Sequence, residues 1–210
     1  MDPPTRIQMR KAWGFCERHA WGWIAVEAAF RDWYMHGPAI LYADLMRRAA
    51  ALFDIYGPMQ NTRVRISLRG WKHCLMCEVG FGPCSRSFAP VELIKRGRDL
   101  SRLRSMAQRT RPYWEKAVCG NCAGNGSVAR CRKHFLEDPG SAMSLQRQKE
   151  LVTYIFHHVA KYSCSFCVGF HGTETEEDIA ALIMAVGWCS GWGIFLSIMS
   201  ESCRPEGAFL

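Results

Sequence analysis

Residues 144–162 read Ser-Leu-Gln-Arg-Gln-Lys-Glu-Leu-Val-Thr-Tyr-Ile-Phe-His-His-Val-Ala-Lys-Tyr and decide the fold class of this 210-residue chain. Leu151, Val152, Ile155 and Val159 recur at intervals of three and four residues, which places them on one face of a helix. Most of the residues between them are polar and fall on the opposite face. The segment therefore predicts a long amphipathic helix that packs against other helices.

Segments before this helix repeat the helical pattern. Residues 24–34 are rich in good helix formers, and residues 40–52 carry an apolar stripe at helical spacing. Each of these two predicted helices stops at a Gly-Pro pair. Residues 90–108 predict a basic helix, whereas the alternation Thr-Arg-Val-Arg-Ile-Ser over residues 62–67 predicts one short strand.

The sequence after the long helix predicts two buried helical pieces. Thr175 and Asp178 form a capping box that opens this region. Residues 179–200 carry no formal charge and are long enough to cross a bilayer, which is the alternative reading. Glycine and serine residues in the middle of this segment, and the lack of a Lys or Arg flank before Arg204, favour two helices that break near residues 187–193.

These elements predict a mainly α fold, in which an irregular helical domain carries cysteine/histidine zinc knuckles and at most one short sheet. The chain is 49% hydrophobic and 22% charged, which excludes a disordered chain. We expect a single compact domain over residues 1–210. Its sub-units would be a helical N-terminal region (residues 1–70), a cysteine-rich basic region (residues 71–140) and a helical C-terminal region (residues 141–210).

The strongest chemical signal precedes the long helix as Cys119-x2-Cys122-x8-Cys131-x2-His134. Three thiolates and one imidazole complete a tetrahedral zinc site, and the Gly and Asn residues between them suit the tight turns of such a site. Because four protein ligands leave no position for water, the site is predicted to be structural. Buried thiols without a metal are the alternative.

A second set of ligands is split between two distant pairs, Cys16-x2-His19 and Cys74-x2-Cys77. Joined together, the two pairs form another closed Cys3His site, which gives about two zinc ions per chain. Packing of the first pair against neighbouring tryptophans without a metal is one alternative. The other is a crossed pairing of Cys74 and Cys77 with Cys131 and His134, and of Cys16 and His19 with Cys119 and Cys122.

A third pair, Cys164-x2-Cys167, follows the long helix. It is a candidate redox dithiol, or a third metal site completed by His171 or His157. Ordinary core or surface thiols are the alternative for these two cysteines.

Positive charge gathers in the middle of a chain whose formal net charge is +8. Residues 86–133 contain twelve Lys and Arg against three Asp and Glu, a net +9. Most are arginine, which suits forked contacts with phosphate or carboxylate. Solvated helix faces neutralised by the acidic residues of 134–210 are the alternative. The predicted basic patch consists of Arg98, Arg102, Arg104, Arg109 and Arg111.

The first residues, Met-Asp-Pro-Pro-Thr-Arg, lack the apolar segment of a secretory signal, so we expect a cytoplasmic location and prefer no membrane association. In that compartment, the eleven cysteines are thiols or metal thiolates instead of disulfides.

Short motifs follow one another along residues 13–188: Gly14-Phe15-Cys16-Glu-Arg-His19, Gly37-Pro38-Ala-Ile-Leu41-Tyr42, Cys74-Leu-Met-Cys77, Cys131-Arg-Lys-His134-Phe135 and Ala185-Val186-Gly187-Trp188. In this order they resemble an uncharacterised bacterial domain family in which Cys-Pro-x-Cys and Gly-Phe-Cys-x2-His motifs alternate. The resemblance implies helices and cysteine ligands but no function, since the family has no established activity. This chain departs from the family pattern by lacking a Cys-x2-Cys ahead of Cys16 and by carrying Cys164 and Cys167.

Three functions fit these observations. The leading one is a zinc-stabilised cytosolic interaction or regulatory protein that binds an acidic partner, because the ligand sets are closed and no catalytic motif is recognisable. The second is a metal- or thiol-dependent enzyme of a small-molecule pathway, with Cys164 and Cys167 as its distinctive site. The third is a zinc-containing nucleic-acid-binding protein, in which Tyr113 and Trp114 stack on bases. The sequence leaves the choice between enzyme and binding protein open.

Overall fold

Helices build the fold, and the described residues contain no strand. The computed structural model describes residues 3–30, 34–80, 90–138 and 142–201. The mainly α fold class predicted from the sequence is therefore confirmed.

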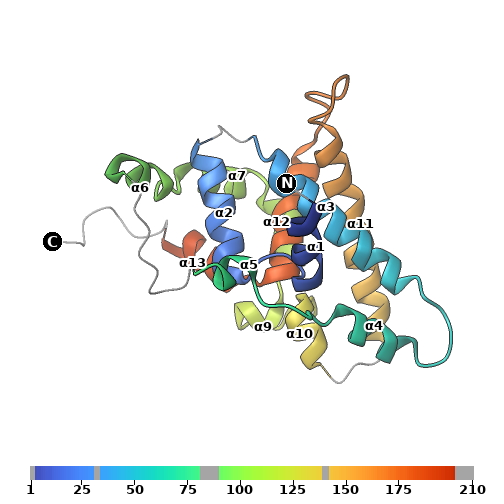
Figure 1. The fold of residues 1–210 in the computed structure, drawn as a ribbon. Helices are drawn as coiled ribbons and strands as arrows, with labels where there is room; N and C mark the ends of the chain where they lie inside the picture. Colours follow the sequence, from blue (N-terminus) through green and yellow to red (C-terminus); the bar gives the residue numbers. More distant parts are fainter. Residues whose placement is uncertain (1–2, 31–33, 81–89, 139–141, 202–210) are drawn as a thin grey trace.

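The central element is α12 (Glu176–Ser190), which is buried at every position from Ala180 to Cys189. The long helices α3 (His36–Phe53) and α11 (Ala142–Cys164) pack against it and against each other (Figure 1). Because α12 has neighbours all around beyond its acidic first turn, its sequence from Ala180 to Cys189 is apolar on every side instead of amphipathic. The prediction of a long helix over residues 144–162 is confirmed by α11.

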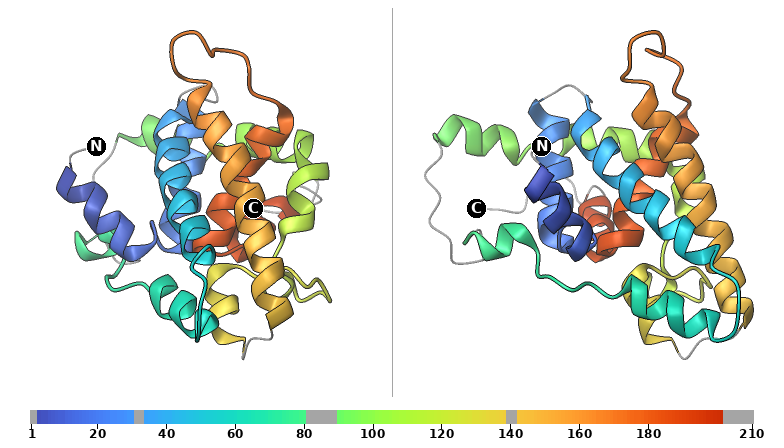
Figure 2. Two further views of the ribbon diagram at one scale, coloured as in Figure 1. Left: turned by 90° about the vertical axis from the view of Figure 1, so that its right-hand side faces the viewer. Right: turned by 45° about the vertical axis from the view of Figure 1, so that its right-hand side comes forward.

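Shorter helices surround this centre (Figure 2). α2 (Glu17–Phe30) contacts α12 and also packs against α7 (Ser101–Arg109), α6 (Val91–Gly97) and α13 (Gly193–Glu201). The remaining elements are α1 (Pro3–Ala12), α4 (Gln60–Leu68), α5 (Leu75–Glu78), α8 (Arg111–Trp114), a 3-10 turn (Glu115–Ala117), α9 (Gly120–Ala123) and α10 (Arg132–Glu137).

The last two helices follow the predicted pattern. The backbone N–H of Asp178 donates to Thr175 Oγ1 at 3.2 Å, and the backbone N–H of Thr175 donates to the Asp178 carboxylate at 3.0 Å, which confirms the capping box. α12 ends at Gly191, whose φ of +120° favours glycine, and α13 starts two residues later. No helix in the described parts of the chain combines the length and apolar content of a bilayer-spanning segment.

Two local predictions were wrong. Residues 62–67 lie within helix α4, not in a strand, because Val64 and Leu68 are four residues apart and both fully buried. Arg65 Nε also donates to Asn61 Oδ1 at 2.8 Å along the same helix. The basic segment 90–108 is two helices, α6 and α7, and the Asp99 carboxylate accepts from the backbone N–H of Ser101 at the start of the second.

An aromatic cluster joins the beginning of α2 to the last two helices. The rings of Trp21 and Phe195 stack with centroids 4.5 Å apart, and Trp114 meets Phe195 edge-on at 5.0 Å. Trp21 Nε1 donates to the carbonyl of Gly191 at 2.9 Å. The ring of Trp192 lies against Gly187, where an added Cβ would approach Trp192 to 2.3 Å. Gly187 thus provides the space that this ring needs.

Candidate metal centres

Each of the four ligand pairs lies at the first turn of a helix. Cys74, Cys119 and Cys131 are the N-cap residues of α5, α9 and α10, and Cys16 directly precedes α2. The second ligand of each pair lies three residues later, on the same turn. Backbone N–H groups at a helix start have no carbonyl partner within the helix, so they are available to stabilise a thiolate.

The C-terminal cluster consists of Cys119, Cys122, Cys131 and His134, whose ligand atoms all lie within 4.8 Å of one another. His134 Nδ1 lies 3.2 Å from the sulfur of Cys119 and 3.3 Å from each of the other two sulfurs. The sulfurs of Cys122 and Cys131 are 3.8 Å apart.

The N-terminal cluster consists of Cys16, His19, Cys74 and Cys77 and has nearly the same dimensions. His19 Nδ1 lies 3.2 Å from the sulfur of Cys16 and 3.4 Å from the sulfurs of Cys74 and Cys77. The sulfurs of Cys16 and Cys77 are 3.8 Å apart. The structure therefore groups the eight residues by the first arrangement considered from the sequence, and the crossed pairing is not formed.

These separations match the edges of a zinc tetrahedron. Zn–S bonds of about 2.3 Å and Zn–N bonds of about 2.0 Å at tetrahedral angles separate two sulfurs by about 3.8 Å, and a sulfur from a nitrogen by about 3.5 Å. Both clusters have these edges to within a few tenths of an ångström. Each cluster can therefore hold a metal ion with four protein ligands.

Protons are shared unequally among the thiols of the C-terminal cluster. Hydrogen bonds from the side chains of Cys122 and Cys131, with their backbone N–H groups, hold the pKa of Cys119 well below its usual range. The same side-chain contact with Cys119 raises the pKa of Cys122 and of Cys131. At neutral pH a metal ion must displace protons from Cys122 and Cys131, so its affinity falls as the pH falls.

The second ring nitrogen of the histidine has a different neighbour in each cluster. His134 Nε2 lies 3.8 Å from the carboxylate of Glu137, one turn further along α10. His19 Nε2 lies 2.9 Å from the Arg18 guanidinium. A histidine that binds a metal through one nitrogen donates its other N–H to an acceptor, commonly a carboxylate. Glu137 is an acceptor that lies near His134 but beyond hydrogen-bond distance, whereas Arg18 is a donor. Sequence reasoning missed both residues because neither occupies a ligand position of its motif.

Solvent exposure also distinguishes the two clusters. Cys119 and Cys131 are buried, whereas Cys77 is exposed. We therefore expect the zinc-loaded protein to release its two ions to a chelator in two phases, with the N-terminal site emptied first. Time-resolved chelation with a colorimetric zinc indicator measures the two phases. Cys77→Ser should remove the fast phase and leave the slow one; loss of the slow phase instead would contradict this order.

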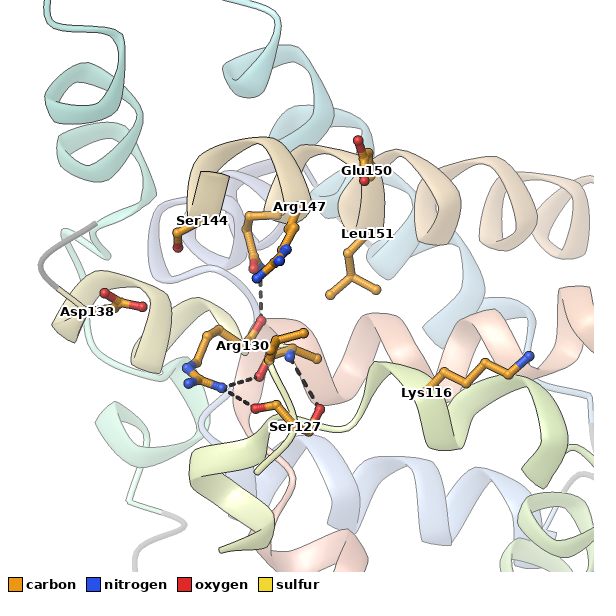
Figure 3. A pocket seen from close by; sticks show the side chains of 11 residues that line it. Lys116, Ser127, Arg130, Asp138, Ser144, Arg147, Glu150 and Leu151 are labelled. Carbon is orange, nitrogen blue, oxygen red and sulfur yellow. Dashed lines mark hydrogen bonds between the residues drawn. The ribbon is translucent and has the colours of Figure 1, made fainter. Parts of the chain in front are cut away.

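A polar cavity of about 520 Å³ lies between the C-terminal cluster's loop and α11 (Figure 3). Gln148 Nε2 donates to the carbonyl of Arg130 at 2.9 Å, and Arg130 Nη1 donates to the carbonyl of Ser127 at 2.7 Å. The first bond attaches the loop between Cys122 and Cys131 to the long helix, and the second closes a turn within that loop. The cavity wall thus supports the metal ligands.

The third cysteine pair does not form a comparable group with His171 among the described residues. Cys164 ends α11 and Cys167 lies in the turn that follows, where the chain protrudes beyond the helix bundle (Figure 1). Both are exposed. A position at the C-terminal end of a helix disfavours a thiolate, because the helix dipole is negative there.

Exposure of Cys164 and Cys167 predicts that a thiol reagent labels both in the folded protein at neutral pH. The zinc content should not change during this labelling, because neither sulfur belongs to a cluster. Mass spectrometry of the labelled protein, first intact and then digested, checks both points. If neither cysteine reacts until the protein is denatured, their exposed placement is wrong.

The predicted basic patch is partly used within the fold. Arg104 Nε donates to the carbonyl of Ile198 at 3.1 Å, Arg109 pairs with Glu176 at 3.4 Å, and Arg111 pairs with Glu115 at 2.8 Å. Arg98 and Arg102 are exposed. Trp114, expected to stack on bases in the nucleic-acid hypothesis, is only 4% exposed and donates to the carbonyl of Ala107.

Comparison of this chain with family models, with curated proteins and with solved structures gives no match. The family resemblance of residues 13–188 stays a prediction. The described residues themselves define a helical protein with two Cys3His clusters of metal-binding geometry.

Proposed function

We propose that the protein is a zinc-stabilised interaction protein that binds an acidic protein partner in the cytoplasm. The observation that supports it best is the closure of both clusters, each with three thiols and one imidazole at the edges of a zinc tetrahedron. Four protein ligands of this type leave no coordination position for a substrate, which is the arrangement of structural zinc sites. The reducing conditions of the cytoplasm keep cysteines available as thiolate ligands.

The two zinc ions would stabilise the first turns of helices that are too short to be stable on their own. α5 and α9 have only four residues each, far fewer than the dozen or more that an isolated helix needs. Metal coordination at their first turns supplies the missing stabilisation. Elemental analysis should give about two zinc ions per chain; iron with sulfide, or no metal in folded protein, would contradict the zinc assignment.

The proposed partner surface lies on α6, which extends at the edge of the molecule (Figures 1 and 2). Arg96 attaches this helix to α2 by donating to the carbonyls of Ala29 and Phe30, with its guanidinium over the Phe30 ring. We define the α6 surface as the exposed residues Val91, Ile94, Lys95 and Arg98, whose spacing places them on one face of the helix.

Apolar side chains beside basic ones match an amphipathic acidic segment of another protein. Val91 is 60% exposed and Ile94 is 37% exposed, so a partner would remove apolar surface from water. A nucleic-acid partner is less well supported, because Trp114 is in the core and the apolar residues of α6 offer nothing to a phosphate backbone.

A helical peptide with leucines on one face and glutamates on the other is a suitable probe for the α6 surface. We expect binding that weakens with added salt and that Ile94→Asp reduces at least about tenfold, because the substitution removes an apolar contact and repels the glutamates. Ile66→Asp on α4 is the matched control, since Ile66 is 48% exposed. Equal losses in both variants, or stronger binding to duplex DNA than to the peptide, would overturn the acidic-protein assignment.

A further inference from the structure

A second cavity, of about 380 Å³, lies at the base of the segment that protrudes between α11 and α12 (Figure 1). Its walls come from parts of the chain that are distant in sequence: the approach to α3, α7, the end of α11 with the segment that follows it, and the first turn of α12. We call it the aromatic cavity. Neither metal cluster and no residue of the α6 surface contributes to its described lining.

Three aromatic side chains of the lining lie close together. The ring of Phe166 meets that of Tyr34 with centroids 4.9 Å apart and an interplanar angle of 76°, and that of Tyr162 at 5.1 Å and 64°. His36, outside the lining, packs against Phe166 at 5.2 Å and supports this group. Steeply inclined rings can form adjoining walls of a site for an organic cation, because the face of each ring carries partial negative charge.

A carboxylate also lines the aromatic cavity. The Oε2 atom of Glu174 is buried and accepts no hydrogen bond from any described residue. Arg109, the one arginine or lysine in the described lining, pairs instead with the Glu176 carboxylate at 3.4 Å. A buried carboxylate oxygen without a donor costs free energy. The described residues therefore leave a negative charge at this cavity that a cationic ligand would neutralise.

The charge of Glu174 also acts on the aromatic wall. Burial raises the pKa of the Tyr162 hydroxyl, and the Glu174 carboxylate raises it further, whereas Arg109 opposes the rise. Tyr162 is therefore a neutral phenol at physiological pH. Its ring and the Glu174 carboxylate attract a cation together.

Hydrogen-bonding capacity decides which kind of cation suits the cavity. A primary ammonium group has three N–H donors and a guanidinium group has five, and each donor needs an acceptor when it is buried. Ser165 Oγ in the lining already donates to the carbonyl of Tyr162 at 2.8 Å. A trimethylammonium group has no N–H to satisfy, and its methyl groups pack on ring faces.

We propose that the aromatic cavity binds the trimethylammonium group of an organic cation. The methyl groups contact the rings of Tyr34, Tyr162 and Phe166, and the Glu174 carboxylate neutralises the charge. This inference goes beyond the function proposed above, since it adds a ligand of positive charge at a place remote from the metal clusters and from the α6 surface.

Calorimetric titration of the full chain with choline tests this site. Dimethylbutanol, in which a carbon atom replaces the choline nitrogen, is the neutral probe of the same shape. We expect saturable binding of one choline and at least about tenfold weaker binding of dimethylbutanol, because only the cation is attracted by the ring faces and the carboxylate.

Two glutamate variants test the charge. Glu174→Gln should weaken choline binding at least about tenfold and leave dimethylbutanol unchanged, because it removes only the charge. Glu92→Gln, at an exposed position on α6, is the matched control and should change neither. Choline should also raise the melting temperature of the wild type more than that of the Glu174→Gln variant.

Two phenylalanine variants test the aromatic wall. Phe166→Leu keeps an apolar side chain but removes the ring, so it should weaken choline binding and spare dimethylbutanol. Phe170→Leu is the matched control, since Phe170 lies in the same protruding segment, is 56% exposed and does not line the cavity. Circular dichroism confirms folding of each variant. Equal losses of choline binding in the two variants would contradict the proposed wall.

A short lysine peptide, in trimethylated and unmodified forms, distinguishes the sources of the group. Tighter binding of the trimethylated peptide than of choline assigns the site to a modified protein side chain, and the reverse order assigns it to a free compound. A folded chain that binds neither choline nor the trimethylated peptide, or that binds choline and dimethylbutanol equally, overturns this inference. The zinc and α6 proposals are unaffected by that result.

Discussion

Replacing Cys131 by serine is expected to remove one of the two zinc ions and most of the stability of the fold. The side chain is 1% exposed, and the residue is both a ligand and the N-cap of α10, which packs against α12 and α4. Apparent binding free energies of structural zinc reach about 10–16 kcal/mol, as large as the whole unfolding free energy of about 5–15 kcal/mol of an ordinary domain. A neutral serine hydroxyl is a poor substitute for the thiolate.

Elemental analysis and thermal denaturation followed by circular dichroism measure the two effects of Cys131→Ser. Cys164→Ser is the matched control, because this cysteine is exposed and belongs to neither cluster. The control should keep about two zinc ions and the wild-type melting temperature. A Cys131→Ser variant with unchanged zinc content and melting temperature would show that the C-terminal cluster does not bind the metal.

Gly187→Ala should destabilise the fold by about 1–3 kcal/mol or more through overpacking. The added methyl group would lie 2.3 Å from Cε2 of Trp192, inside van der Waals contact, and that indole is fully buried against Trp21 and Trp114. Neither the ring nor helix α12 has space to retreat. For a chain of this length, a loss of about 1–3 kcal/mol corresponds to a fall of roughly 2–12 °C in melting temperature.

Gly22→Ala provides the comparison for Gly187→Ala. Gly22 also lies within a helix, but nothing lies within 4 Å of an added Cβ there. Alanine at this position should be neutral or stabilise by up to about 1 kcal/mol, through its higher helix propensity. Both variants should keep the full zinc content. Equal melting temperatures for the two would contradict the tight packing of Trp192 on α12.

The long helices were predictable from the sequence because their signals are local. The apolar spacing of residues 144–162 and the capping box at Thr175 identified α11 and the start of α12. The short helices escaped prediction, since four-residue elements such as α5 and α9 have no periodicity to detect. The alternation over residues 62–67 is misleading because the two buried residues of α4, Val64 and Leu68, follow a helical spacing of four residues.

The ligand residues were also visible in the sequence, but their grouping was not. Spacing alone left two complete pairings of the eight ligands open, and only the packing of α5 beside the start of α2 separates them. The contacts of buried arginines could not be predicted from the sequence either, because their partners are brought close only by the fold. Arg132 lies over the Trp13 ring and donates to the carbonyls of Cys189 and Leu68, residues far away in the sequence, and burial lowers its pKa.

The contacts of α2 with residues 191–194 also affect the order in which the chain can fold. Trp21 bonds to Gly191 across 170 positions, and the Glu17 carboxylate accepts from the backbone N–H of Ile194 across 177. The ligands of the C-terminal cluster span 15 positions, whereas Cys16 and Cys77 are 61 apart. Long loops close more slowly, so the C-terminal cluster assembles first when the whole chain refolds. During synthesis the order is reversed for the ligands, because all four N-terminal ligands up to Cys77 are made before Cys119, while the start of α2 gains its last neighbours only when α13 has been made.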